Sequence, residues 1–375
     1  MNFVRRRRRR PPLANGSGTT DAAVMMQDAS KWFGPIHAVT EVSLAVPWGS
    51  ILGVVGPSGA GKTTMIRMMT GALGPTRGSV RVLGERPSHF RRATRERVGY
   101  MPQSFSLYPE LTAGENVDFV ASLFGMLLLR RRRRSRDVLR LVELWDARNR
   151  KASAMSGGMQ RRLELACALV HDPVLLFLDE PTAGIDPLLR ARIWDELHRQ
   201  RDNGRTLIVT TQYVTEAEEC DSVALIAGGR LVALGTPDEL RRLAAGGDIV
   251  EVETTAPFDG TRLTRLDEVR QVRPTGARSF QAIVPDAGTA TPSIVDAVTE
   301  AGGEVVVARE FRPSFDDVFA ELVERSGSGE AGTLTMATHD GSDGAPPQPP
   351  TTPTPPTGSD AAAPAPGPAS MGVGR

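Results

Sequence analysis

A glycine-rich loop between a short apolar run and a helical pattern most restricts what this chain can fold into. The loop reads Gly-Pro-Ser-Gly-Ala-Gly-Lys-Thr-Thr over residues 56–64, after the apolar run Ile51–Val55 and at the start of the helical pattern Thr64–Thr70. It matches the pattern GxxxxGK[ST], in which glycines let successive backbone N–H groups turn inward around phosphate oxygens, and the helix start adds partial positive charge. The sequence therefore predicts a strand-loop-helix unit that binds the phosphates of a nucleotide.

Individual residues of this loop have separate expected roles. Lys62 is expected to reach the β and γ phosphates, and Thr63 to ligate Mg²⁺. Lys62 is also one of only three lysines among 45 basic residues, so it stands out against an arginine-rich background. The expected phosphate-binding residues are Gly56, Pro57, Ser58, Gly59, Ala60, Gly61, Lys62, Thr63 and Thr64.

A second motif is an apolar run that ends in two carboxylates. Val174–Leu178 is followed directly by Asp179 and Glu180. A strand here would place Asp179 at the carboxyl edge of a sheet, where the ligands of open α/β folds bind. In enzymes with this phosphate-binding loop such an aspartate helps to hold Mg²⁺, and Glu180 would orient or deprotonate an attacking water.

Short apolar runs alternate with helical patterns from about residue 24 to residue 243. The runs Ile51–Val55, Val174–Leu178 and Leu207–Thr211 are separated by helical segments, which favours an α/β fold with a mostly parallel sheet covered by helices. Between about residues 109 and 150, apolar residues recur at three-residue and four-residue spacing instead. That spacing predicts a helical insertion.

The last third of the chain has a different pattern. The β-rich pieces Ile249–Glu253 and Glu304–Ala308 alternate with the helical candidates Ser293–Ala301 and Phe315–Glu324. This alternation predicts a small α+β domain. The final segment is rich in Pro, Gly and Ala and has little to bury, so we expect it to be disordered.

At this point the chain resembles the ABC ATPase family, because that family's further motifs follow in order. Met155-Ser-Gly-Gly-Met159 resembles the LSGGQ signature with Met at its first and last positions, and Ala183-Gly-Ile-Asp186 resembles the D-loop. Gln103 matches the Q-loop glutamine, and Phe33 matches the aromatic residue that stacks on adenine, although Trp32 lies beside it. Alone, Ser156 could simply cap a helix, and Phe33 could belong to a core.

The resemblance implies how such a site works. Ser156, Gly157 and Gly158 would contact the γ-phosphate of ATP held by the opposite subunit, so that two copies close head-to-tail as a homodimer, with Asp186 also at the nucleotide. Gln103 would help to bind Mg²⁺ and would relay the change to a separate polytopic membrane permease. ATP and Mg²⁺ are the implied cofactors, and the cytoplasmic face of the membrane is the implied location.

The resemblance also implies a domain plan. We expect an arginine-rich disordered tail over residues 1–22, an ABC ATPase domain over 23–245 with its helical subdomain at about 109–172, a small α+β accessory domain over 246–325, and a disordered tail over 326–375. No stretch approaches the roughly 18 apolar residues of a membrane span. Neither Cys167 nor Cys220 has disulfide or zinc spacing, which favours a reducing cytoplasm.

One departure from the family concerns the residue after the run Leu207–Thr211. The family usually has a histidine there, and this chain has Gln212. A glutamine can donate a hydrogen bond to a γ-phosphate oxygen, but it cannot take up a proton near neutral pH. Because Glu180 remains as general base, we expect hydrolysis to be retained. The alternative is a regulatory module that binds ATP without turnover.

The cargo can be inferred only by resemblance. The single ATPase domain, the Thr-Thr-Gln-Tyr variant at residues 210–213 and the C-terminal domain look like the drug- and antibiotic-exporting ABC-2 branch, so we expect export of a hydrophobic or drug-like substrate. An exporter of lipid or polysaccharide and an importer stay open. ABC ATPases that act on DNA or ribosomes carry two such domains or long coiled coils, neither of which is present.

Two arginine runs lie outside these motifs. The formal net charge is only +1, so we expect no specific nucleic-acid partner, and the run Arg5–Arg10 is interpreted as incidental. The run Arg130–Arg134 could contact anionic lipid headgroups or acidic loops of the permease. A solvated face is the simpler interpretation, because five consecutive residues cover every side of a helix.

Overall fold

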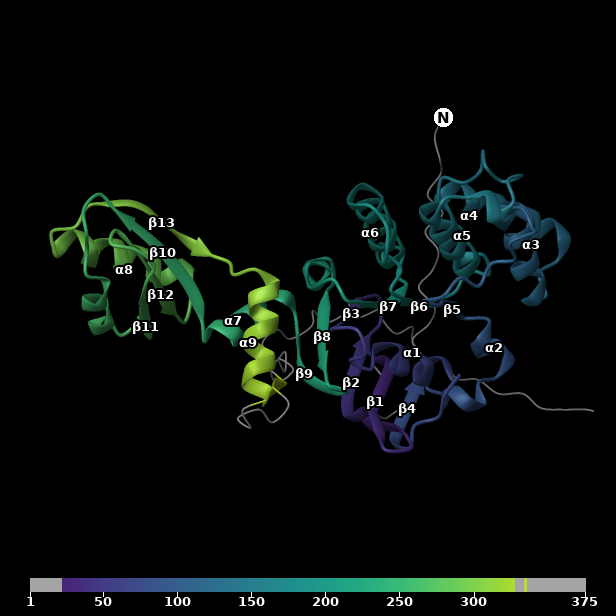
Figure 1. The fold of residues 1–375 in the computed structure, drawn as a ribbon, viewed down its shortest axis with the longest axis horizontal. Coiled ribbons are helices and arrows are strands. Elements are labelled where there is room, and N and C mark those ends of the chain that lie inside the picture. The colour runs from purple at the N-terminus through teal and green to yellow at the C-terminus, as the bar shows by residue number, and fades with distance from the viewer. Residues whose placement is uncertain (1–21, 328–333, 336–375) are drawn as a thin grey trace, which may run out of the picture. The chain divides into compact units, whose positions relative to one another are not determined.

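A seven-stranded sheet forms the centre of the fold. The structure is a computed structural model that describes residues 22–327 and 334–335. Its strand order is β14-β9-β8-β3-β7-β6-β5, and the pairs among β3, β5, β6, β7 and β8 are all parallel (Figure 1). The strands are β3 (Ile51–Val55), β5 (Val98–Met101), β6 (Leu175–Asp179), β7 (Thr206–Thr211), β8 (Ser222–Ala227), β9 (Arg230–Gly235) and β14 (Leu334–Thr335). The predicted mostly parallel α/β sheet is confirmed.

The three apolar runs of the sequence are strands of this sheet. Every residue of β3, β6 and β7 is buried. Strands covered on both faces need continuous apolar runs, which is why these three were recognisable. Their observed bounds differ from the predicted ones by at most one residue at each end.

A second, antiparallel sheet was not predicted. It has the order β2-β1-β4, from β1 (Ala22–Phe33), β2 (Ile36–Pro47) and β4 (Arg77–Val82). The pairing of β1 with β2 shifts register at four places, and Asp28 and Glu41 have positive φ. Each shift interrupts the strict alternation of apolar and polar side chains by which a half-buried strand is recognised.

Helices cover these sheets and form the insertion. They are α1 (Lys62–Thr70), α2 (Arg92–Arg95), α3 (Ala113–Leu123), α4 (Leu128–Leu141), α5 (Gly157–Leu169), α6 (Pro187–Asp202) and α7 (Pro237–Ala245). The predicted helical insertion corresponds to α3, α4 and α5, which pack on one another. Thr112 starts α3 with a reciprocal capping box to Glu115, which satisfies two otherwise unpaired backbone N–H groups.

The C-terminal part contains a four-stranded antiparallel sheet and a helix. The strand order is β11-β12-β10-β13, from β10 (Asp248–Thr254), β11 (Gln271–Pro274), β12 (Ser279–Val284) and β13 (Val305–Phe311). Helix α8 (Ala287–Glu300) lies against this sheet (Figure 1). The two share a separate apolar core that includes Val250, Phe280 and Ile294.

The last helix packs into the same apolar core as residues of the central sheet. On α9 (Phe315–Gly327), Phe315, Val318 and Leu322 are buried in the same apolar cluster as Leu240 of α7 and Val232 of β9. Ser326, Gly327 and the short strand β14 fall within the segment 326–375, for which we expected disorder, but they belong to a helix and a strand. The rest of that segment and residues 1–21, with Arg5–Arg10, lie outside the described residues.

No helix in the described part of the chain is long and apolar enough to cross a membrane.

Candidate nucleotide-binding site

Three strand ends bring the predicted site residues to one edge of the central sheet. Strand β7 lies between β3 and β6, with Val55 opposite Thr211 and Asp179 opposite Thr210. Gly56, Glu180 and Gln212 are the residues that directly follow these three neighbouring strands. Because the strands are parallel, all three residues emerge at the carboxyl edge, where α/β folds bind ligands.

The glycine loop turns tightly between β3 and α1. Gly61 has φ 105°, and a Cβ there would lie 2.4 Å from the carbonyl oxygen of Ala38, so no other residue fits. Lys62 is only 4% exposed, and its Nζ donates to the carbonyl oxygens of Gly56 at 2.8 Å and Pro57 at 3.0 Å. The loop therefore surrounds a buried ammonium group, which is the arrangement required to hold phosphate oxygens.

Asp179 has the features of a cation ligand. Its Oδ1 accepts hydrogen bonds from Thr63 Oγ1 at 3.3 Å and Thr210 Oγ1 at 2.6 Å, while its Oδ2 is buried without a partner. A buried carboxylate oxygen without a partner is costly, and a bound cation would satisfy it. Thr63 and Asp179, on adjacent elements, therefore fit Mg²⁺ better than either residue fits a purely structural role.

Burial raises the pKa of the Asp179 carboxyl, opposed by the hydrogen bonds from Thr210 and Thr63. A raised pKa in the folded state means that ionised Asp179 destabilises the fold above its usual pKa. Asp179→Asn should therefore raise the thermal midpoint of the ligand-free protein at pH 7.5, because an Asn amide needs no cation and keeps the accepting oxygen. The gain should shrink as the pH falls through the raised pKa. Thermal unfolding at several pH values measures it.

The matched control for this prediction is Asp186→Asn, at an exposed helix cap where Asn serves as well as Asp. It should leave the midpoint unchanged. With ATP and Mg²⁺ added, the native chain should have the higher thermal midpoint, since only the native chain gains ligand binding energy. A lower ligand-free midpoint for Asp179→Asn would contradict the cost assigned to its charge.

Glu180 lies between two other predicted site residues. Its Oε2 accepts a hydrogen bond from Gln103 Nε2 at 2.9 Å, and its Oε1 is 3.5 Å from Lys62 Nζ. Glu180 also has φ 52°, which costs of order 1–3 kcal/mol for a residue with a side chain and is typical of functional sites. Residues 62, 103 and 180 thus form one cluster, and it includes the glutamine expected near the metal.

Arg161 organises the backbone around this cluster, and sequence reasoning missed it. Its guanidinium donates to the carbonyl oxygens of Pro102 at 3.1 Å, Gln103 at 2.8 Å and Glu180 at 3.2 Å, and it pairs with Glu164 at 2.7 Å. Arg161 lies on α5, three residues after the end of the Ser-Gly-Gly motif. It therefore ties that helix to Gln103 and Glu180 through the fixed fork of one guanidinium.

The Ser-Gly-Gly motif lies at the start of α5. Ser156 caps the helix, accepting from the Met159 N–H at 3.4 Å, so the structural role weighed from sequence is present. Gly158 approaches Leu189 of α6, just after the D-loop residue Asp186. Among the described residues, no hydrogen bond or ion pair joins residues 156–158 to residues 56–64. The structure thus packs the signature against α6, three residues after Asp186 of the D-loop, but records no bond between the signature and the glycine loop of the same chain.

Of the two candidate adenine-stacking rings, Phe33 is the more available. Trp32 is held by the guanidinium of Arg77 at 5.4 Å and the ring of His37 at 5.1 Å. Phe33 is 45% exposed at the end of β1, with Lys31 Nζ 5.5 Å from its ring. Phe33 is thus the more exposed of the two rings and stays the predicted adenine contact.

Gln212 is exposed and precedes a well-anchored segment, the turn η3 (Val214–Glu219). Glu216 on this turn is buried, accepts from Thr182 Oγ1 at 3.0 Å, and lies 3.5 Å from Arg190 Nε. The segment after Gln212 is therefore tied to the residues on either side of the D-loop.

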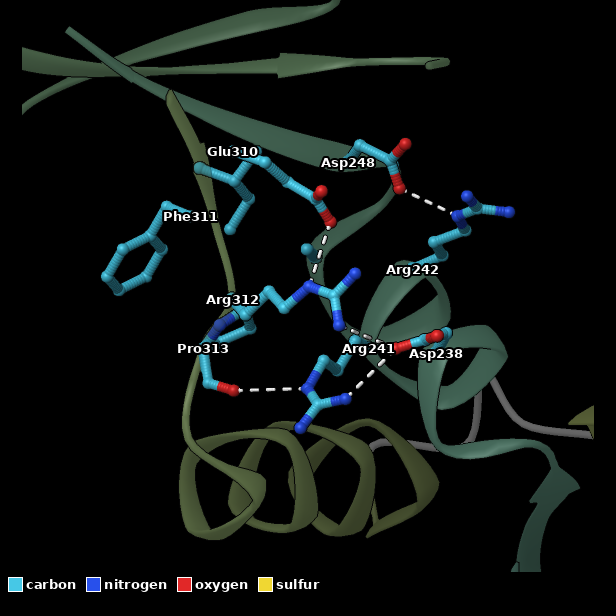
Figure 2. A pocket seen from close by; sticks show the side chains of 11 residues that line it. Asp238, Arg241, Arg242, Asp248, Glu310, Phe311, Arg312 and Pro313 are labelled. Atoms are coloured by element: carbon cyan, nitrogen blue, oxygen red, sulfur yellow. Dashed lines mark hydrogen bonds and ion pairs between the residues drawn. The ribbon is translucent and has the colours of Figure 1, made fainter. Parts of the chain in front are cut away.

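A separate pocket lies between α7, the start of β10 and the link from β13 to α9 (Figure 2). Its charges are paired with one another. Arg241 contacts Asp238 at 3.0 Å, Arg242 contacts Asp248 at 2.7 Å, and Arg312 contacts Glu310 at 3.2 Å. Because these charges satisfy one another, the pocket is best explained as a polar junction where the chain enters and leaves the C-terminal sheet.

Two families match the chain. The family described as ABC transporter matches residues 39–183, which run from before the glycine loop to beyond Glu180. The family described as ATP-binding protein DrrA1-3-like, C-terminal domain, matches residues 235–323.

Three curated relatives are similar over most of the ATPase region. Daunorubicin resistance ATP-binding protein DrrA3 of Streptomyces coeruleorubidus is 35% identical over 80% of this chain and 96% of its own length. Probable multidrug ABC transporter ATP-binding protein YbhF of Escherichia coli strain K12 is 38% identical over 61% of this chain and 39% of its own. Nod factor export ATP-binding protein I of Rhizobium etli is 37% identical over 65% and 79%.

Solved structures of the same fold are also similar. An ATP-binding subunit of an ABC transporter superposes with TM-score 0.54 at 28% identity, covering 59% of this chain and 92% of that one. A dimeric ATP-binding cassette in a post-hydrolysis state, bound to ADP and Pi, superposes with TM-score 0.53 at 27% identity, covering 57% and 98%.

Proposed function

The chain belongs to the ABC transporter family of ATP-binding proteins and is an ABC ATPase with a DrrA-like C-terminal domain, and from this premise we propose that it hydrolyses ATP to power export through a separate membrane permease. The observation that carries the proposal is the cluster of Lys62, Gln103 and Glu180 beside the cation-ready oxygens of Asp179 and Thr63. A site that only bound nucleotide would need no carboxylate beside the phosphate-binding lysine.

Each residue of the cluster has a part in hydrolysis. Lys62 and the loop N–H groups bind the β and γ phosphates, and Thr63, Asp179 and Gln103 hold Mg²⁺, which when bound neutralises charge on those phosphates. Glu180 takes a proton from the attacking water, and the hydrogen bond from Gln103 holds its carboxylate in place. Phe33 stacks on the adenine ring. Gln212 donates its amide N–H to the γ-phosphate.

The site is completed by a second copy of the chain. Ser156, Gly157 and Gly158 are exposed or half-buried at the N-terminus of α5, where backbone N–H groups favour an anion, yet no described contact joins them to the glycine loop of the same chain. A head-to-tail homodimer places them, with Asp186, against the nucleotide of the partner. The solved cassette that is similar to this chain is a dimer, which supports this arrangement.

The relatives support the direction and class of transport. Their names describe daunorubicin resistance, a multidrug transporter and Nod factor export. We assign this chain to export of a hydrophobic or drug-like substrate, at the cytoplasmic face of the membrane, with a polytopic permease contacted near Gln103. An exported lipid-linked or sugar-containing molecule is the closest alternative, given the Nod factor exporters.

We keep the domain bounds predicted from the sequence. Residues 23–245 form the ATPase domain and residues 246–325 the accessory domain, although α9 packs into the ATPase core.

Co-purification of the tagged chain with a polytopic membrane protein, together with Mg²⁺-dependent release of phosphate, tests the proposed function. Phosphate release without any such partner would confine the function to ATP hydrolysis, and absence of both would refute it.

A second function is favoured by Gln212 alone, namely a regulatory module that binds ATP without turnover.

In a hydrolysing site, Gln212 would instead donate a hydrogen bond to the γ-phosphate. Gln212→Ala should then lower kcat roughly tenfold to a hundredfold, the usual effect of losing one donor to a charged group. Gln212→His should keep turnover but introduce a rate change near pH 6.5, the ordinary pKa of histidine. Measuring kcat from pH 6 to 8 for both variants checks this. Equal rates for Gln212→Ala and the native chain would remove Gln212 from the mechanism.

A further inference from the structure

Apolar side chains gather at the turn between α3 and α4. Leu123 is 68% exposed, Leu127 81% and Leu129 83%, and Leu128 between them is also exposed. Single exposed leucines are ordinary, but four within residues 123–129 are a local concentration of exposed apolar side chains of the kind found at interaction surfaces. We use the name α3–α4 turn for residues 123–133, which include the end of α3, the connecting loop and the first six residues of α4.

The arginine run that follows is not uniform. Arg134 is structural, since it donates to the last carbonyl oxygens of α5, Leu169 and Val170, both at 3.1 Å. Arg130, Arg132 and Arg133 are exposed, and within residues 22–327 the structure records no side-chain hydrogen bond or ion pair for them. The interpretation as a solvated face therefore fits Arg130, Arg132 and Arg133, whereas Arg134 is half-buried and bonded to the end of α5.

The apolar and basic groups are arranged in sequence along the chain. Leu123 ends α3, Leu127 precedes α4, and Leu128 and Leu129 begin α4. The exposed arginines follow directly, within one turn of that helix. An order of exposed leucines followed by exposed arginines suits the boundary of a membrane, where apolar side chains enter the acyl region and basic side chains bind headgroup phosphates.

The turn is also close to the segment assigned to the permease. Tyr108, five residues after Gln103, packs edge-on against Phe119 of α3 with ring centroids 4.7 Å apart. Leu123 follows Phe119 by four residues, on the same face of α3 and about 6 Å along its axis. Through Tyr108 and α3, the α3–α4 turn is therefore connected to the segment around Gln103 that we assign to the permease.

We propose that the α3–α4 turn binds an anionic lipid surface, with Leu127 and Leu129 entering the headgroup region and Arg130, Arg132 and Arg133 binding lipid phosphates. The charge of the turn selects this occupant, since it contains no acidic residue. A purely apolar partner would leave three exposed arginines uncompensated. The proposal rests on the proposed function only in that it places this face at a membrane.

The test is flotation of the purified full-length chain with vesicles, without ATP. Vesicles of phosphatidylcholine with phosphatidylglycerol should bind the chain, and vesicles of phosphatidylcholine alone should bind it far more weakly. Replacing Arg130, Arg132 and Arg133 with Gln should weaken binding on the order of a hundredfold. Leu127→Ser with Leu129→Ser should weaken it at least about tenfold, including at high salt, where apolar contact persists.

Two controls separate this surface from other sources of binding. Because Arg5–Arg10 could bind the same vesicles, every measurement is repeated in a full-length chain with those six residues changed to Gln. Arg262, Arg265 and Arg278 changed to Gln remove the same charge from the exposed surface of the C-terminal part, and Val306→Ser removes an exposed apolar residue there. These control variants should bind as the native chain does.

The possible outcomes decide the proposal. Equal vesicle binding by the turn variants and the native chain would overturn it. So would a turn variant that floats normally but no longer co-purifies with a polytopic protein in detergent, because the turn would then dock on protein. The turn is outside the nucleotide site, so ATP turnover should stay at the native rate in all these variants. A native chain that binds the vesicles but hydrolyses no ATP would count against the proposed function and not against the lipid contact.

Discussion

Glu180→Gln should lower ATP turnover roughly 10²-fold to 10⁴-fold, the usual contribution of a positioned general base. Glutamine has the size of glutamate and keeps an oxygen that can accept the hydrogen bond from Gln103, but it cannot take a proton from water. Lys62, Thr63 and Asp179 are unchanged, so ATP and Mg²⁺ should bind as in the native chain. Phosphate release and equilibrium ATP binding, measured on the same preparation, check both halves of the expectation.

The variant should also accumulate as an ATP-bound dimer. Bound ATP stabilises the closed dimer, and in this variant hydrolysis no longer releases it. Size-exclusion chromatography with ATP and Mg²⁺ should therefore show more dimer for Glu180→Gln than for the native chain. Glu324→Gln, at an exposed position on α9, is the matched control and should change neither rate nor dimerisation. A Glu180→Gln rate within about tenfold of the native rate would rule out Glu180 as the general base.

Much of the site was predictable because its chemistry is local in sequence. The glycine loop, the strand end at Asp179 and Glu180, and the capping position of Ser156 are each set within a few neighbouring residues. Continuous apolar runs revealed β3 and β6, because strands buried on both faces contain little else. Strands with irregular register, such as β1 and β2, have no such signal.

The residues that were missed act through contacts distant in sequence. Arg161 reaches Gln103 from 58 positions away, and Thr210 reaches Asp179 from 31. No local pattern marks an arginine that will bind three backbone carbonyls. Thr210 did have a signal that could have been used, because a hydroxyl residue near the end of an otherwise apolar strand must find a partner when buried. The packing of α9 into the ATPase core was likewise not predictable from the sequence, because an apolar helix face does not specify which core it packs against.

Mixing two inactive variants should restore ATP turnover if the site is shared between subunits. Lys62→Ala removes the phosphate-binding ammonium from one half of the site. Gly157→Glu damages the other half, and a Cβ at Gly157 meets open space within its own chain, so the variant should fold. Its carboxylate would face the γ-phosphate held by the partner and repel it. Each variant alone should therefore hydrolyse almost no ATP.

In a mixed dimer, the intact loop of the Gly157→Glu subunit faces the intact signature of the Lys62→Ala subunit, so one of the two sites is complete. With free exchange at equal amounts, half the dimers are mixed and half of their sites work, which predicts about a quarter of the native turnover. Phosphate release before and after mixing measures it. Mixing Lys62→Ala with Glu180→Gln is the matched control, because both changes lie on the same half and neither mixed site is whole. Recovery in that control, or none with Gly157→Glu, would mean that residues 156–158 do not complete the site of a second chain.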